Sequence, residues 1–110
     1  MADAVLHRIP VVAGLAYIER VRHLPSTFTA TLVPEPDNRY FQHAIAIVSG
    51  GEKVGYLAPE VSRRYFEPLL ARGTADPVTC PGRRGSHADH DTSGVELLLD
   101  FSALPIEAAE

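Results

Sequence analysis

Apolar and polar residues alternate along several short stretches of the chain, and this pattern predicts β-strands. In the stretch 28–33, Phe28, Ala30 and Leu32 fall on one side and their neighbours on the other, which is the period of a half-buried strand. Further apolar stretches are predicted strands at 9–18, 44–48, 53–58, 95–101 and, more weakly, 77–80. About six short strands predict a small, mainly β barrel, because closure removes the exposed edges of a sheet.

The connections between these strands carry turn and helix signals. Paired glycines in the segment 49–52 predict a hairpin turn, since glycine tolerates the positive φ that tight turns require. The segment 59–73 has apolar residues at helical spacing, a proline in the first turn and a glycine at the end, so we predict a helix. Pro68 inside it predicts a kink, or two short helices, with the break near Glu67.

The C-terminal third is less regular. The segment 82–94 is rich in turn formers and charges and is predicted to be a loop or a hairpin tip, and the tail from Ser102 is predicted to fray. With 110 residues the chain fits one domain, with its core at about 9–101, because two cores would each be too small to be stable.

The composition limits the class of protein. With 45% hydrophobic and 22% charged residues it is that of a globular protein, and no apolar run approaches the roughly 20 residues of a membrane span. The N-terminus lacks the apolar core of a secretory signal, so we expect a cytoplasmic location. The single cysteine, Cys80, cannot form an intrachain disulfide, which agrees with a reducing compartment.

Charge is distributed unevenly. The net charge of −4 argues against a protein that coats nucleic acid. Residues 1–73 hold eight Lys or Arg against seven Asp or Glu, a sum of +1, whereas residues 74–110 hold two against seven, a sum of −5. A local basic face could therefore exist in the first two thirds of the chain.

The segment EPDNRYFQHAI, residues 35–45, leads from a predicted turn into a predicted strand. Asp37 and Asn38 have turn chemistry, because their short polar side chains can bond to the nearby backbone. Tyr40 and Phe41 are adjacent and point to opposite faces of an extended chain, so only one ring is easily buried. The other ring is left to solvent or to a ligand.

Together with its flanking motifs, this segment resembles the HIRAN domain family, including its small stand-alone bacterial members. The motifs are VVAGLAY at 11–17, EPDN followed by Tyr40 and the strand that begins AI, VGYL at 54–57, and the helix with RRYFEPLL. The resemblance covers about residues 9–73 and extends more weakly through the last strand. It implies an OB-like or SH3-like β-barrel with one or two inserted helices. It also implies a module that, in eukaryotic fork-remodelling ATPases, grips single-stranded DNA at its 3′-hydroxyl end.

The family's DNA-binding residues carry over only in part. Its stacking aromatics fall on Tyr17 and Tyr40. The position of the aspartate that receives the terminal sugar hydroxyl is Phe41, and that of a usual asparagine is His43. A basic residue of the first strand is replaced by Ala16. Phe41 has no hydrogen-bond acceptor and Ala16 has no charge, so these positions depart from end-specific recognition.

The candidate nucleic-acid-binding residues are Tyr17, Arg39, Tyr40, Phe41, His43, Lys53 and Tyr56. The tyrosines would stack on bases, or would simply pack at the edge of the core with wet hydroxyl groups. Arg39 and Lys53 would contact phosphates, or would simply be solvated. Arg20 and Arg22, in the link after the first strand, could extend the basic surface around these residues. Phe41 would otherwise fill a gap that relatives leave polar.

Two enzymatic or metal readings are weaker. Cys80, His87 and His90, with two aspartates nearby, are acceptable zinc ligands, but their spacing matches no common zinc module, and we expect no cofactor. Ser86, His87 and Asp91 lie in a segment without the rigid support that a catalytic triad needs. There is no phosphate-binding glycine-rich loop with its lysine in the sequence.

Three functions remain open at this point. The first is a non-enzymatic module for single-stranded or 3′-end DNA, in DNA repair or processing. The second is a protein-interaction module that kept the barrel and lost the ligand contacts, favoured by the acidic charge, Ala16 and Phe41. A zinc-dependent hydrolase is the third and has the least support.

Overall fold

The computed structural model describes residues 9–12, 17–73, 75–86 and 95–108 of the chain. Its strands are β1 (Ile9–Val12), β2 (Thr27–Pro34), β3 (Ile45–Ser49), β4 (Glu52–Leu57), β5 (Val78–Ser86) and β6 (Val95–Leu99). They form a closed barrel in the order β1-β4-β3-β2-β5-β6, with every neighbouring pair antiparallel. The predicted small β-barrel with one or two inserted helices is confirmed.

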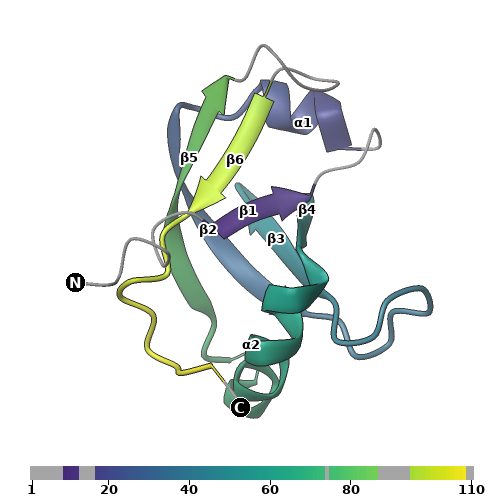
Figure 1. The fold of residues 1–110 in the computed structure, drawn as a ribbon. Coiled ribbons are helices and arrows are strands. Elements are labelled where there is room, and N and C mark those ends of the chain that lie inside the picture. Colours follow the sequence, from purple (N-terminus) through teal and green to yellow (C-terminus); the bar gives the residue numbers. More distant parts are fainter. Residues whose placement is uncertain (1–8, 13–16, 74, 87–94, 109–110) are drawn as a thin grey trace.

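The helices α1 (Ile18–Arg22) and α2 (Pro59–Arg72) lie at opposite ends of the barrel (Figure 1). Alternation in β2 places Ala30 and Leu32 in the core, as the sequence predicts. The interior is filled by apolar side chains from the strands and from the inner face of α2, among them Ile45, Ile47, Val54 and Leu99. Neither described helix has the length and apolar character that crossing a membrane requires.

The hairpin between β3 and β4 forms where the paired glycines predict it. Gly50 and Gly51 have φ values of 62° and 83°, in the left-handed region that side chains with a Cβ rarely adopt. This tight turn sets β4 against β3, so Tyr56 of β4 lies opposite Ala46 of β3. The hairpin therefore delivers Tyr56 to a defined position on the barrel wall.

The prediction of two short helices in the segment 59–73 is wrong, because one helix runs through Pro68. Pro59 lies in its first turn and Gly73, with φ of 80°, ends it, as expected. Pro68 removes one backbone hydrogen bond, but the helix face with Tyr65, Phe66 and Leu69 is buried against the barrel. Tertiary packing thus holds the helix together across the proline.

The first strand is shorter than predicted. β1 ends at Val12, residues 13–16 lie outside the described residues, and Ile18 begins α1 instead of ending a strand. Val21 of this helix is buried, as is Leu24 just after it, so tertiary burial outweighs the strand preference of β-branched residues here. Arg20 and Arg22 are therefore on a helix rather than in an irregular link.

The segment from Gly82 was also predicted incorrectly. Residues 82–86 continue β5 and pair with β6, whereas the rest of the expected loop, 87–94, lies outside the described residues. Gly82 pairs with both β2 and β6, and Gly85 pairs with β6, so strand pairing overrides the turn preference of these glycines. In the tail, the partly buried Leu104, Ile106 and Ala108 pack against the core, whereas the expectation that the tail frays stays a prediction.

Candidate nucleic-acid interface

A cleft of about 710 Å³ opens at one side of the barrel. It lies where the start of α1, the loop between β2 and β3, the end of β4 and the start of α2 meet. Its lining residues are Tyr17, Asn38, Arg39, Tyr40, Phe41, Tyr56, Leu57 and Pro59. Five of these were candidate binding residues on sequence grounds, and they come from segments up to about 40 positions apart along the chain. The fold thus gathers the predicted rings in one place.

Tyr56 is the central ring of the cleft. The ring centroid of Tyr17 lies 6.3 Å from that of Tyr56, and the centroid of Phe41 lies 6.2 Å from it on another side. The planes are tilted by 56° and 49°, so these rings do not stack flat on one another. Phe41, which is 58% exposed, and Tyr40, which is 86% exposed, are the rings of the cleft most accessible to a planar ligand.

The loop 35–44, between β2 and β3, extends away from the barrel (Figure 1) and contains Tyr40 and Phe41. Its base is closed by the backbone N–H of Glu35, which donates to the carbonyl oxygen of Ala44 at 2.8 Å. The Oδ1 atom of Asn38 accepts hydrogen bonds from the backbone N–H groups of Tyr40 at 2.8 Å and Phe41 at 2.9 Å. Asn38 is thus the turn residue that orients both rings, as the turn chemistry of this segment predicts.

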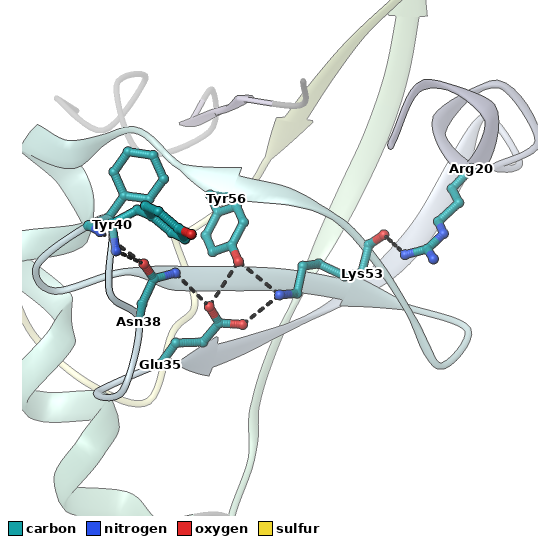
Figure 2. A network of polar contacts seen from close by, with 7 residues as sticks. Arg20, Glu35, Asn38, Tyr40, Lys53 and Tyr56 are labelled. Atoms are coloured by element: carbon teal, nitrogen blue, oxygen red, sulfur yellow. Dashed lines mark hydrogen bonds and ion pairs between the residues drawn. The ribbon is translucent and has the colours of Figure 1, made fainter. Parts of the chain in front are cut away.

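A polar network joins this loop to β4, as Figure 2 shows. Asn38 Nδ2 donates to Glu35 Oε1 at 3.0 Å, and the hydroxyl of Tyr56 donates to the same oxygen at 2.9 Å. Lys53 Nζ lies 2.7 Å from Glu35 Oε2 and donates to the Tyr56 hydroxyl at 2.8 Å. Glu35 therefore connects the aromatic loop, the central ring of the cleft and the nearest lysine.

The network shifts the ionisation of its members. Burial alone would raise the pKa of Glu35, but hydrogen bonds from Lys53, Asn38 and Tyr56 and the charge of Lys53 outweigh it and lower that pKa. The hydrogen bond to Glu35 is the largest cause that raises the pKa of Lys53 well above its ordinary value. Burial raises the pKa of the Tyr56 hydroxyl. At neutral pH the network consequently holds a carboxylate, an ammonium and a neutral phenol.

The cations around the cleft differ in how far they are neutralised. Arg39 lines the cleft, is exposed, and has no ion pair within the described residues. The guanidinium of Arg20 lies 5.8 Å from the Tyr17 ring centre and 3.9 Å from a Glu52 carboxylate oxygen, in an exposed pair that binds it weakly. Lys53 forms an ion pair with Glu35, and this pair disfavours a contact between Lys53 and phosphate. That contact stays a prediction.

Two candidate residues have surroundings that the sequence did not indicate. Phe41 is 58% exposed, so it does not fill a gap in the core, because the loop that Asn38 caps holds it outside the barrel. His43 has φ of 58°, and its ring packs edge-on against Phe66 of α2 at 5.2 Å between centroids. His43 is not among the described residues that line the cleft.

Of the metal candidates, only Cys80 lies among the described residues, and it does not line this cleft. His87 and His90 lie outside the described residues, as do Asp89, Asp91 and Ala16, and no group of metal-ligating side chains is present in the described part of the chain. Cys80 is buried in β5, and burial together with the charge of Asp100 raises the pKa of its thiol to about 12. A thiol kept protonated is a poor metal ligand, because the thiolate is the form that binds.

Sequence reasoning missed the role of Glu35. The sequence identifies it only as the start of a turn, whereas its carboxylate contacts residues 18 and 21 positions away, on β4. No signal in the sequence indicated this contact. Lys53 and Tyr56 are three residues apart, which puts them on opposite faces of a regular strand, and only the structure shows the register shift between Ile47 and Val48 that alters the local pairing of this hairpin.

The family comparison agrees with this geometry. The sequence model of the HIRAN domain matches residues 10–99, and the chain belongs to the HIRAN domain family. This is a family of DNA-binding modules, which is consistent with nucleic-acid binding by the present chain. No curated protein and no solved structure proved similar enough to count as a match.

Proposed function

We propose that the chain is a non-enzymatic module that binds single-stranded DNA in the cleft, in the context of DNA repair or processing. The observation that carries the proposal is the grouping of Tyr17, Phe41 and Tyr56 around one opening, with Arg39 at its edge. Rings of this kind stack on bases whatever the sequence, since every base has a flat π face. Membership of the HIRAN domain family supports DNA as the ligand.

The size and charge of the cleft suit a short single-stranded segment. About 710 Å³ accommodates one or two nucleotides, whereas a duplex presents its bases already stacked and out of reach. The net charge of −4 disfavours binding along a long polyanion, so affinity has to come mainly from the rings. Each stacked base is worth about 1–3 kcal/mol.

Recognition of a 3′ end requires a separate test. The resemblance to the HIRAN domain family puts Phe41 at the position of the residue that would receive the terminal sugar hydroxyl, and its ring offers no acceptor. We therefore propose that stacking supplies the binding and that a free 3′-hydroxyl adds little. Oligonucleotides with a 3′-hydroxyl and with a blocked 3′ end are expected to bind with similar affinity.

Fluorescence anisotropy with a labelled oligonucleotide of about ten nucleotides at low salt tests the proposal. Tyr17→Ala and Tyr40→Ala are expected to weaken binding by about 5-fold or more each, from the lower bound of the stacking energy. Leu70→Ala is the matched control, because Leu70 is an exposed apolar residue of α2 that does not line the cleft. Absence of saturable binding, or affinity that both tyrosine variants leave unchanged, would refute the proposal.

A second candidate is a protein-interaction module, and the exposed pair Tyr40 and Phe41 favours it. Such rings side by side form an apolar patch that suits a protein partner. Phe41→Asp separates the two functions. Loss of a captured protein partner would support the interaction module, whereas a gain of 3′-end DNA binding would support a DNA module that had lost its end contact.

A further inference from the structure

Beside the part of the cleft formed by β4 lies a lysine whose charge is already paired within the protein. Lys53 is not one of the described residues lining the cleft, although its neighbour in the network, Tyr56, is. Its ammonium is 2.7 Å from Glu35 Oε2 and 2.8 Å from the Tyr56 hydroxyl, and it lies 4.9 Å from the centre of the Tyr56 ring. The charge of Lys53 is thus satisfied within the protein on several sides (Figure 2).

This pair is better held than the other ion pairs near the cleft. The side chains of Lys53 and Glu35 are 30% and 24% exposed, whereas those of Arg20 and Glu52 are 44% and 63% exposed at a separation of 3.9 Å. Partly buried charges are screened less by salt and by water than exposed ones. A phosphate that approached Lys53 would have to displace the Glu35 carboxylate and would meet its negative charge.

We propose that Glu35 is a specificity-determining residue of the cleft. Because Glu35 neutralises Lys53, DNA binds in the cleft mainly through base stacking and not through contacts between Lys53 and phosphate groups. The inference rests on the proposed function. According to this inference, the salt dependence of DNA affinity comes from the guanidinium groups at the rim of the cleft, above all that of Arg39. Lys53 does not contact DNA. The unaltered protein therefore accepts short single-stranded segments with a weak dependence on salt.

Glu35→Gln tests this assignment, because glutamine keeps an oxygen that can accept from Asn38 and Tyr56 while it removes the charge. Each phosphate contact with single-stranded DNA adds about 0.7 to the slope of log affinity against log salt concentration. Freed Lys53 is expected to steepen this slope by about 0.7, so the loss of affinity between about 50 mM and about 200 mM salt grows by about 2.5-fold. The double variant Glu35→Gln with Lys53→Met is expected to return to the original slope.

Two further variants keep the test independent of folding. Lys53→Met alone is expected to leave the slope unchanged, because the native lysine touches no phosphate. Glu67→Gln is the matched charge control, since Glu67 is exposed on α2, does not line the cleft and has no ion pair within the described residues. It changes the net charge by the same amount and is expected to leave the slope as it is.

The outcomes separate the inference from the proposed function. A slope that Lys53→Met flattens by about 0.7 overturns the inference, since Lys53 would then contact a phosphate in the native protein. Equal steepening by Glu35→Gln and Glu67→Gln overturns it as well, because the effect would be one of overall charge. Absence of binding by the unaltered protein overturns the proposed function itself.

Discussion

The hydrogen bonds of Asn38 give the sharpest prediction about how the cleft is built. Asn38→Ala removes the acceptor for the N–H groups of Tyr40 and Phe41 and the donor to Glu35, at 2.8, 2.9 and 3.0 Å. A protein hydrogen bond contributes about 0.5–1.5 kcal/mol net. Because water can replace the partners in this exposed loop, we take the lower part of that range and expect the ordered loop to lose about 1–1.5 kcal/mol.

The loss of loop order is expected to lower the affinity for DNA. About 1–1.5 kcal/mol corresponds to about a 5- to 13-fold change in the equilibrium between the ordered and the disordered loop, and apparent affinity falls with the fraction of competent molecules. DNA binding by Asn38→Ala is therefore expected to weaken by about 5-fold or more. The barrel should remain folded, because removing a core side chain such as Leu99 would cost about 2–5 kcal/mol and Asn38 contributes none of that packing.

Anisotropy titration and urea unfolding, performed on the same samples, measure the two effects. Gln42→Ala is the control from the same loop, since Gln42 is exposed and makes no side-chain hydrogen bond within the described residues. It should leave both affinity and stability unchanged. Affinity that stays within about twofold in Asn38→Ala would refute the reasoning, because a loop oriented by Asn38 could not then be needed for binding.

Three other predictions concern pH, packing and the thiol. Since the pKa of Glu35 is lowered from its ordinary value of 4.5, its contribution to stability is present above that value and is lost as pH falls through the folded-state pKa, so Glu35→Gln should flatten acid unfolding followed by circular dichroism. Gly82→Ala should lower the free energy of unfolding in urea by about 1–3 kcal/mol, because the new Cβ would lie 2.5 Å from Phe28 ring atoms, and an unchanged value would contradict that packing. Cys80, buried and with its thiol pKa raised to about 12, should not react with a thiol reagent at neutral pH until urea unfolds the chain, and prompt labelling of folded protein would contradict its burial.

Local chemistry decided which parts of the fold could be predicted from the sequence. Gly50 and Gly51 specify a turn by themselves, and Pro59 and Gly73 mark the two ends of α2, so these features needed no knowledge of distant residues. Helix α1 has five residues and no side-chain hydrogen bond at its N-terminal cap, so no local sequence signal predicts it. The 82–86 part of β5 depends on partners in β2 and β6, which sequence pattern alone cannot supply.

The same distinction applies to the cleft. Tyr17, Tyr40 and Tyr56 could be named in advance because flat, amphipathic rings carry their chemistry with them. The ion pairing of Lys53 could not be named in advance. It depends on the carboxylate of Glu35, 18 positions earlier in the chain, which the closed barrel brings to 2.7 Å from the ammonium group. Which cations remain available to a ligand is therefore a property of the fold.

An NMR titration of ¹⁵N-labelled protein with a short single-stranded oligonucleotide tests the central claim most directly. If the rings around Tyr56 form the binding site, shifts should concentrate on Tyr17, on residues 38–41 and on residues 56–57. The barrel has another pocket, of about 510 Å³, lined in part by Thr27, Thr29 and Arg83. Shifts confined to that pocket, with the amides of the aromatic cleft unmoved, would contradict the account.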